Sequence, residues 1–326
     1  MCSSDLLTMQ QTRILIIGAG GQLGSELAAG LRQVYGTDQV VTADIKNVQG
    51  KLQEGPFEMF DVLNKEKLTD VIRKHRITQI YHLAAVLSAT GEQEPERAWK
   101  INMDSLTNVL EVARTLKIEK VYWPSSIAVF GKDTPKEHTP QSTVMSPSTV
   151  YGISKLAGEL WCAYYFTRFG VDVRSLRYPG LIGYKTPPGG GTTDYAVEIF
   201  HKALQEKKYQ CYLSEHTTLP MMYMADAVRA TIELMEAPSE KIKIRTGYNI
   251  SALSLSPSIL AKNICNHIPE FKISYCPDFR DEIAINWPHS IDDESARKDW
   301  GWQHKYGVEA MTADMIKNLR LIYPNN

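Results

Sequence analysis

Short strand-like segments alternate with longer helix-like segments along the first half of the chain. The five short segments are residues 13–17, 39–43, 77–83, 120–124 and 171–177. The first of them is a β-branched run without polar alternation, which is typical of a strand buried on both faces of a parallel sheet. The segments between them, including residues 25–31 and 99–113, repeat apolar residues at helical spacing. The alternation predicts an α/β fold with a doubly wound, parallel Rossmann sheet.

The pattern becomes irregular after residue 180, where residues 187–191 read Pro-Pro-Gly-Gly-Gly. We expect residues 13–180 to form the Rossmann domain. Residues 181–222 and 251–326 are expected to form a smaller, substrate-binding part. Residues 224–235 are again amphipathic, so a return segment at about 223–250 is expected to rejoin the sheet and interleave the two parts. Residues 1–12 contain neither an apolar core nor the arginines of a transit peptide, and we expect a flexible extension there.

A glycine-rich turn joins the first expected strand to the first helix. Gly18 would permit the tight turn, Gly21 a close approach of the backbone to a pyrophosphate, and Gly24 close helix packing. The spacing G-x-x-G-x-x-G departs from the commoner G-x-G-x-x-G. Asp44 follows the second strand, where a carboxylate accepts hydrogen bonds from an adenosine ribose and repels a 2′-phosphate. The sequence therefore predicts a dinucleotide site that favours NAD over NADP, although nearby Lys46 weakens this preference.

Tyr151 and Lys155 stand four residues apart in a helix expected over residues 150–169. Such residues share one helix face, with Cβ atoms roughly 5–6 Å apart. A phenol with a pKa near 10 is a poor base, and lowering that pKa by ~3 units requires about 4 kcal/mol of phenolate stabilisation. We expect the Lys155 ammonium, near a cationic nicotinamide ring, to provide it. The pair predicts removal of an alcohol proton while a hydride leaves to NAD⁺.

Composition excludes several classes of function. The 326 residues carry a formal net charge of −1, which provides no basic field for nucleic acid, and no apolar run approaches the ~20 residues needed to span a bilayer. We expect neither a nucleic-acid nor a membrane partner. The five cysteines form no Cys-x-x-Cys pair and no metal-ligand spacing with the eight histidines. We therefore expect no metal, and a cytoplasmic protein with reduced thiols.

Five motifs occur in a characteristic order: the glycine turn at 18–24, His-Leu-Ala-Ala at 82–85, Ser-Ser-Ile-Ala-Val-Phe-Gly at 125–131, Tyr-x-x-x-Lys at 151–155 and Arg-Tyr-Pro-Gly at 177–180. The set resembles the extended short-chain dehydrogenase/reductase superfamily over nearly the whole chain. Within that superfamily, residues 87–92, 189–196 and 286–293 are similar to the L-threonine 3-dehydrogenases of the short-chain type.

The resemblance implies roles at the matched positions. Ser126 matches the catalytic hydroxyl, Asn102 matches a helix asparagine that supports the active-site hydrogen-bond network, and Lys155 also holds the nicotinamide ribose. The expected cofactor-binding residues are Gly18, Gly21, Gln22, Leu23, Gly24, Asp44, Asp61, Val62, Leu83, Ala84, Ala85, Tyr151, Lys155, Tyr178, Pro179 and Leu181. The implied substrate-binding residues are Ser88, Ser125, Ser126, Tyr151, Thr192, Thr193, Asp194 and Trp287. Two structural alternatives stay open: Asp194 as the cap of a helix beginning at residue 195, and Trp287 as a core residue.

The implied reaction is oxidation of the C3 hydroxyl of L-threonine by NAD⁺ to 2-amino-3-oxobutanoate, with Tyr151 as base assisted by Lys155 and Ser126. The resemblance also implies a homodimer formed through the helices at 99–113 and 150–169; packing within one chain is the alternative.

Two other functions share this fold and cofactor. A nucleotide-sugar epimerase or dehydratase would use the same three catalytic residues, but residues 181–223 contain four lysines and no arginine to hold a sugar diphosphate. The other is a non-catalytic NAD-sensing regulator, and the intact Ser126, Tyr151 and Lys155 set argues against it.

Overall fold

A parallel six-stranded sheet forms the centre of the computed structural model, which describes residues 11–48, 52, 54–189 and 191–324. Residues 1–10 of the expected N-terminal extension lie outside the described residues. The strand order is β3-β2-β1-β4-β5-β7, and every neighbouring pair is parallel. The strands are β1 (Ile14–Ile17), β2 (Val40–Asp44), β3 (Phe57–Met59), β4 (Gln79–His82), β5 (Lys120–Tyr122) and β7 (Val173–Arg174). The order reverses between β1 and β4, where ligands bind in open α/β sheets.

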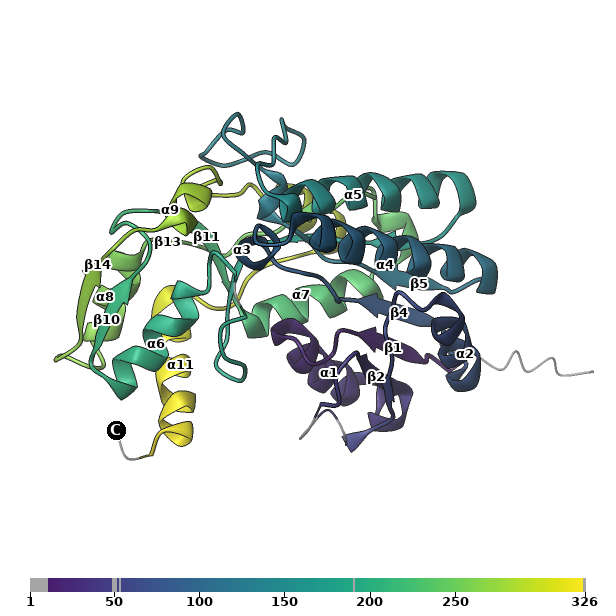
Figure 1. Cartoon of the computed structure of the whole chain (residues 1–326), viewed down its shortest axis with the longest axis horizontal. Coiled ribbons are helices and arrows are strands. Elements are labelled where there is room, and N and C mark those ends of the chain that lie inside the picture. Colours follow the sequence, from purple (N-terminus) through teal and green to yellow (C-terminus); the bar gives the residue numbers. More distant parts are fainter. Residues whose placement is uncertain (1–10, 49–51, 53, 190, 325–326) are drawn as a thin grey trace, which may run out of the picture.

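Helices cover both faces of this sheet. In Figure 1, α4 (Pro95–Leu116) and α5 (Val150–Phe169) lie above the sheet. Helices α1 (Gln22–Tyr35) and α7 (Met224–Glu236) pack against each other on the opposite face. Helix α2 (Lys65–His75) packs on the same face as α4. Along β1, Ile14 and Ile16 belong to the core shared with α1 and α7, whereas Leu15 and Ile17 belong to the core shared with α2, α4 and α5. Both side-chain directions are buried, which explains the uniformly apolar run and confirms the predicted α/β fold.

The segment at residues 171–177, predicted as one strand, is divided into two short strands. Strand β7 pairs with β5, and β8 (Leu176–Tyr178) pairs with β6 (Ser125–Ser126) and β12 (Tyr248–Asn249). The two ladders have the same register, from Val121–Val173 to Ser126–Tyr178. The two chain segments therefore stay side by side across the gap, where the Trp123 N–H donates to the Arg174 carbonyl at 3.0 Å.

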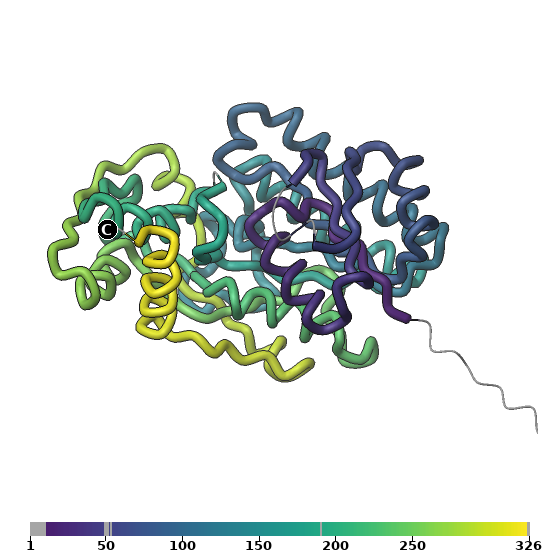
Figure 2. Tube along the Cα trace, turned by 90° about the horizontal axis from the view of Figure 1, so that it is seen from below, coloured from purple at the N-terminus to yellow at the C-terminus, as the bar shows by residue number. Residues whose placement is uncertain are grey.

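A second group of elements is gathered at one end of the molecule (Figures 1 and 2), where α11 lies against α6. Strands β9 (Gly180–Ile182), β11 (Leu219–Tyr223) and β13 (Leu253–Leu255) form a three-stranded sheet, and β10 (Lys208–Cys211) pairs with β14 (Lys272–Tyr275). The helices are α6 (Tyr195–Gln205), α8 (Pro257–Cys265), α9 (Phe279–Ala284) and α11 (Val308–Ile322), whereas α10 (Glu294–Trp300) contacts β12. Their shared core includes Phe200, Leu260 and Met315.

The two groups are not separated cleanly along the chain. Helix α7 returns to the central sheet, as its amphipathic pattern indicated. Ala296 and Trp302, from the C-terminal segment, also pack into the core shared with α7. The division into two domains therefore stays a prediction.

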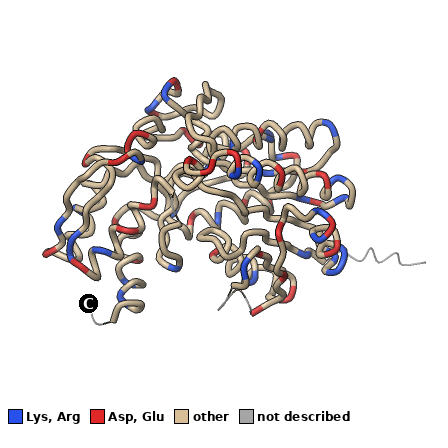
Figure 3. Tube along the Cα trace, in the orientation of Figure 1, with Lys and Arg blue, Asp and Glu red and all other residues tan. Residues whose placement is uncertain are grey.

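Acidic and basic residues are interspersed over the helices and loops (Figure 3). Across the described part of the chain, no helix combines the length and apolar character needed to cross a membrane. No cluster of three or more His, Cys, Asp or Glu side chains suited to a metal ion occurs among these residues either.

Candidate active site

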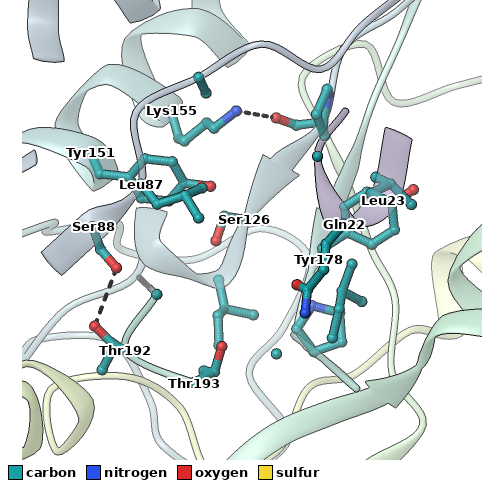
Figure 4. Close-up of a pocket in the computed structure, with 18 of the residues that line it drawn as sticks. Gln22, Leu23, Leu87, Ser88, Ser126, Tyr151, Lys155, Tyr178, Thr192 and Thr193 are labelled. Atoms are coloured by element: carbon teal, nitrogen blue, oxygen red, sulfur yellow. Dashed lines mark hydrogen bonds between the residues drawn. The ribbon is translucent and has the colours of Figure 1, made fainter. Parts of the chain in front are cut away.

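A cleft of about 260 Å³ opens where the central sheet meets the second group of elements. It collects most of the predicted site residues: Gly18, Gly21, Gln22, Leu23, Gly24, Leu83, Ala85, Ser88, Ser125, Ser126, Tyr151, Lys155, Tyr178, Pro179, Leu181, Thr192, Thr193, Asp194 and Trp287. Figure 4 shows Gln22 and Leu23 across the cleft from Ser88 and Tyr151. Five further residues line it that were not among the predicted site residues: Leu87, Pro124, Ile127, Gly180 and Gly191.

The glycine turn forms one wall of the cleft. Gly18 has a φ of +84°, and a Cβ there would lie 2.7 Å from the backbone N of Ala84. A Cβ on Gly24 would lie 2.4 Å from the Gly18 carbonyl oxygen. At Gly21, by contrast, a Cβ would come no closer than 3.4 Å to another residue. Packing therefore explains glycine at positions 18 and 24 but not at position 21.

Features beside Gly21 fit a dinucleotide. Helix α1 begins at Gln22, so its first N–H groups and positive dipole end face the turn. The Gln22 Nε2 atom is buried and has no hydrogen-bond partner among the described residues. A buried donor without a partner costs free energy that a bound acceptor would recover. The turn thus suits the pyrophosphate of a dinucleotide.

Four predicted cofactor residues lie outside the lining of the cleft. Asp44 Oδ2 accepts a hydrogen bond from the Gly20 N–H at 2.9 Å, so its carboxylate is held against the turn. Asp61 Oδ1 accepts from the Leu63 N–H at 2.9 Å, and Val62 is buried in the core shared with α2 and α4. The fourth, Ala84, packs beneath the turn. The assignment of these four to the cofactor site stays a prediction.

Lys155 is held by strong local contacts at the base of the cleft. Its Nζ donates a hydrogen bond to the Pro124 carbonyl oxygen at 2.6 Å and lies 4.3 Å from the centre of the Trp123 ring. The distance from Nζ to the centre of the Tyr151 ring is 5.4 Å. Thr149 caps the helix that carries both residues, with its hydroxyl accepting from the Gly152 N–H.

The pKa values of this pair differ from the expectation drawn from the sequence. Burial raises the pKa of Tyr151 to about 12, while a hydrogen bond with Ser126 acts in the opposite direction. Burial also lowers the pKa of Lys155 to about 7, opposed by Cys162 and Glu159. Burial therefore dominates both shifts, and the pKa of the Tyr151 phenol stays above its ordinary value. A further positive charge beside Tyr151 would lower this pKa.

Asn102 lies behind the cleft rather than in its lining. Its Oδ1 accepts from the Val86 N–H at 2.8 Å, and its Nδ2 donates to the Val86 carbonyl at 3.1 Å and to Ser154 Oγ at 3.1 Å. The side chain thus joins α4, α5 and the loop after β4. This geometry suits a supporting role, which stays a prediction.

The substrate side of the cleft is built around a loop that precedes α6. Ser88 Oγ, from α3 (Ser88–Gly91), lies 3.2 Å from Thr192 Oγ1 (Figure 4). Asp194 Oδ2 accepts from the N–H groups of Gly189 and Gly191, at 2.7 and 2.9 Å. Asp194 is also the N-cap residue of α6, as the structural alternative held, but its side chain makes no cap hydrogen bond to that helix.

The position of Trp287 is compatible with both interpretations, a core residue and a residue that lines the cleft. It is almost fully buried, it belongs to the core shared with α6 and α11, and it lines the cleft.

One buried residue escaped the sequence reasoning. The Glu159 carboxylate accepts from Ser125 Oγ at 2.5 Å and from Arg177 Nε and Nη2 at 2.8 and 2.7 Å. The Ser125 hydroxyl is therefore directed to Glu159. The available signal was a single carboxylate in an otherwise apolar stretch of helix, four residues after Lys155.

Residues 14–251 match the model of the NAD dependent epimerase/dehydratase family. The chain belongs to this family. An uncharacterized epimerase/dehydratase of Staphylococcus aureus (strain MRSA252) is 47% identical over 308 residues, which are 94% of this chain and 96% of that protein.

Solved structures place this family member beside L-threonine dehydrogenases. A GalE-like L-threonine dehydrogenase from Cupriavidus necator, in its holo form, is 56% identical with a TM-score of 0.93, covering 94% of this chain and 99% of that one. A monomeric L-threonine 3-dehydrogenase from a metagenome, in its apo form, is 46% identical with a TM-score of 0.92, covering 95% and 99%. The resemblance found in the sequence motifs is confirmed.

The low pKa of Lys155 predicts a pH-dependent stability. The folded pKa of about 7 lies below the ordinary value of 10.5, so the unfolded chain binds more protons between these values. Stability should therefore rise with pH from about 7 to 10 relative to a Lys155→Met variant, by up to about 4 kcal/mol. Urea unfolding of both proteins without cofactor measures the difference. Parallel pH curves would show that Lys155 keeps an ordinary pKa.

Proposed function

We propose that this family member oxidises the C3 hydroxyl of L-threonine with NAD⁺ to give 2-amino-3-oxobutanoate and NADH. The observation that carries the proposal is that Ser126, Tyr151 and Lys155 line one cleft with the glycine turn, in a chain this similar to L-threonine dehydrogenases. Each group has a chemical task in such an oxidation.

Bound NAD⁺ would supply the hydride acceptor and a positive ring. Gly21, Gln22 and the N-terminus of α1 would hold its pyrophosphate, and Asp44 would accept from the adenosine ribose.

Tyr151 would take the proton from the C3 hydroxyl. The Lys155 ammonium favours the phenolate, and its own charged form is supported by the bond to the Pro124 carbonyl. Ser126 would donate to the substrate oxygen and hold it beside Tyr151.

The substrate side offers groups that suit a zwitterionic amino acid. Hydroxyls of Ser88, Thr192 and Thr193 can donate to a carboxylate or accept from an ammonium. Asp194 would act by holding the loop, because its carboxylate is bound to the N–H groups of Gly189 and Gly191.

A nucleotide-sugar epimerase or dehydratase is less well supported by the cleft. Among the described residues that line it, Lys155 is the only one with a cationic side chain. A sugar diphosphate would bring two phosphates that need positive partners besides the helix that receives the cofactor.

Turnover of L-threonine tests the proposal. NADH formation from NAD⁺ and L-threonine should saturate, and a Tyr151→Phe variant should lose at least about 100-fold in kcat while still binding NADH, because only the proton acceptor is removed. UDP-glucose serves as the competing substrate. Conversion of UDP-glucose without threonine turnover would assign the chain to the epimerases, and NADH binding with neither reaction would favour a sensor.

The choice of NAD over NADP should depend on the charge of Asp44. The Asp44→Asn variant keeps an acceptor for the Gly20 N–H but removes the charge that repels a 2′-phosphate. The ratio of kcat/KM for NAD⁺ to that for NADP⁺ should fall by about 10-fold, which corresponds to ~1.4 kcal/mol. The matched control is Asp38→Asn, an exposed carboxylate before β2, which should leave the ratio unchanged. An unaltered ratio in Asp44→Asn would place the ribose elsewhere.

An apolar stripe on α5 supports a homodimer. Its exposed residues are Ile153, Leu160, Trp161, Tyr164 and Phe169, and exposed Trp99 lies on neighbouring α4. The two helices lie side by side on the outer face of the sheet (Figure 1). A cluster of this size marks an interaction site in soluble proteins. We infer that α4 and α5 pack against the same helices of a second copy.

A charge in this stripe should break the dimer. The Leu160→Glu variant should sediment as a monomer, whereas Leu321→Glu, equally apolar in the parent and exposed on α11, should remain dimeric. Analytical ultracentrifugation at several concentrations measures both. A wild-type monomer at all concentrations would place this chain with its monomeric metagenome relative.

We also propose a division into two domains. Pairing of β12 with β8 supports a cofactor-binding unit made of residues 13–180 and about 223–250, with 181–222 and 251–326 on the substrate side.

We propose a cytoplasmic location on separate grounds. The described cysteines Cys162, Cys211, Cys265 and Cys276 are all free thiols, which supports this location.

A further inference from the structure

The buried carboxylate of Glu159 joins the catalytic helix to the strand that carries Ser126. Glu159 lies on α5, one turn after Lys155 and two turns after Tyr151. Its side chain has no exposed surface, and it accepts three hydrogen bonds, one from Ser125 and two from Arg177. Because Ser125 directly precedes Ser126, this contact acts one residue away from the proposed catalytic hydroxyl.

The three residues that form these hydrogen bonds, Glu159, Ser125 and Arg177, belong to three different elements. Ser125 and Arg177 are register partners in the parallel ladder of β6 and β8, and both donate to the same carboxylate on α5. The same two chain segments are paired in one register from Val121–Val173 to Ser126–Tyr178, which places Ser125 opposite Arg177. Backbone pairing does not join this ladder to α5, and the Glu159 carboxylate supplies a link between them.

The network continues from Arg177 towards the substrate side. Arg177 Nη1 donates to the Gln141 carbonyl at 3.0 Å and to Asn249 Oδ1 at 3.1 Å. Asn249 Nδ2 in turn donates to the Asp292 carbonyl at 3.2 Å, in the segment that follows Trp287. One connected set of hydrogen bonds therefore runs from Glu159 on α5 to the segment that follows Trp287.

Stability alone does not account for a buried ion pair at this place. Apolar residues of similar volume commonly match or exceed the stability of such pairs, because desolvation costs offset the attraction. Glu159 also does not line the cleft, so it does not touch the substrate. Glycine at position 247 provides space for this carboxylate, because a Cβ there would lie 2.9 Å from Glu159 Oε1.

We propose that Glu159 is a positioning residue for the proposed reaction, holding Ser125, and through it Ser126, in register with Tyr151 and Lys155. The inference rests on the proposed function and adds to it a residue outside the cleft. The geometry of the proton transfer depends on α5 and β6 keeping their relative position, and a displacement of about 1 Å can cost about 100-fold in rate.

Three variants of the full-length enzyme test this inference. Ser125→Ala removes one bond and leaves the Glu159–Arg177 pair intact, Glu159→Gln weakens the whole network, and the third variant combines both changes. The two single variants should lower kcat by about 10- to 100-fold. KM for L-threonine and the Kd for NADH, measured by fluorescence, should stay within about 2-fold of the wild-type values. The double variant should be no slower than Glu159→Gln, because both changes break the same link.

Asp172→Asn is the matched control. Asp172 is a carboxylate that also binds a nearly fully buried arginine, Arg174, but it lies away from the cleft. This variant should lower the thermal unfolding midpoint and leave kcat unchanged.

The contrary results separate the positioning role from the proposed function. The positioning role would be overturned if Ser125→Ala kept the wild-type kcat. It would also be overturned if Asp172→Asn lost as much kcat as Glu159→Gln. A raised KM for threonine with unchanged kcat in Ser125→Ala would do so too, because it would assign the hydroxyl to substrate binding. Absence of threonine turnover by the wild-type enzyme would overturn the proposed function, and this inference with it.

Discussion

The segment from Pro124 to Ser126 joins the paired strands to α5, and the arrangement of the candidate active site depends on this junction. Strand β6 continues the chain of β5 and pairs with β8 in the same register in which β5 pairs with β7. The Pro124 carbonyl then accepts from Lys155, the next residue bonds to Glu159, and the one after it lines the cleft. Two consecutive residues thus bond to α5, and the third lines the cleft.

Burial opposes the charged forms of Tyr151 and Lys155 that the proposed proton transfer uses. It pushes the pKa of Tyr151 up and that of Lys155 down, so both side chains favour their neutral forms. A cationic ring in the same low-dielectric cleft would favour the phenolate strongly, because Coulomb interactions are larger there than in water. In the proposed reaction, binding of the oxidised cofactor would therefore favour the deprotonated form of Tyr151.

The local motifs were predictable because each depends on short-range geometry. The turn at Gly18 needs a positive φ, Gly24 leaves no room for a Cβ, and Tyr151 and Lys155 share a helix face at a spacing that any helix enforces. The alternating apolar runs likewise indicated the parallel sheet. The segment at 171–177 was predicted as one strand but is divided into two, because β-propensity does not show where a ladder is interrupted. Asp194 occupies the N-cap position of α6 that its place in the sequence indicated, but only the structure showed that its carboxylate binds the preceding loop.

The sequence by itself determined the fold class, the glycine turn and the shared helix face of Tyr151 and Lys155, because these features depend on local spacing and hydrophobic periodicity. Only the tertiary structure decided that Glu159 joins Ser125 to Arg177, and that loops distant in the chain place Ser88 beside Thr192. It also decided the direction of the pKa shifts at Tyr151 and Lys155. These properties arise from desolvation and from contacts between residues far apart in the chain, which are established only when the sheets and helices pack together.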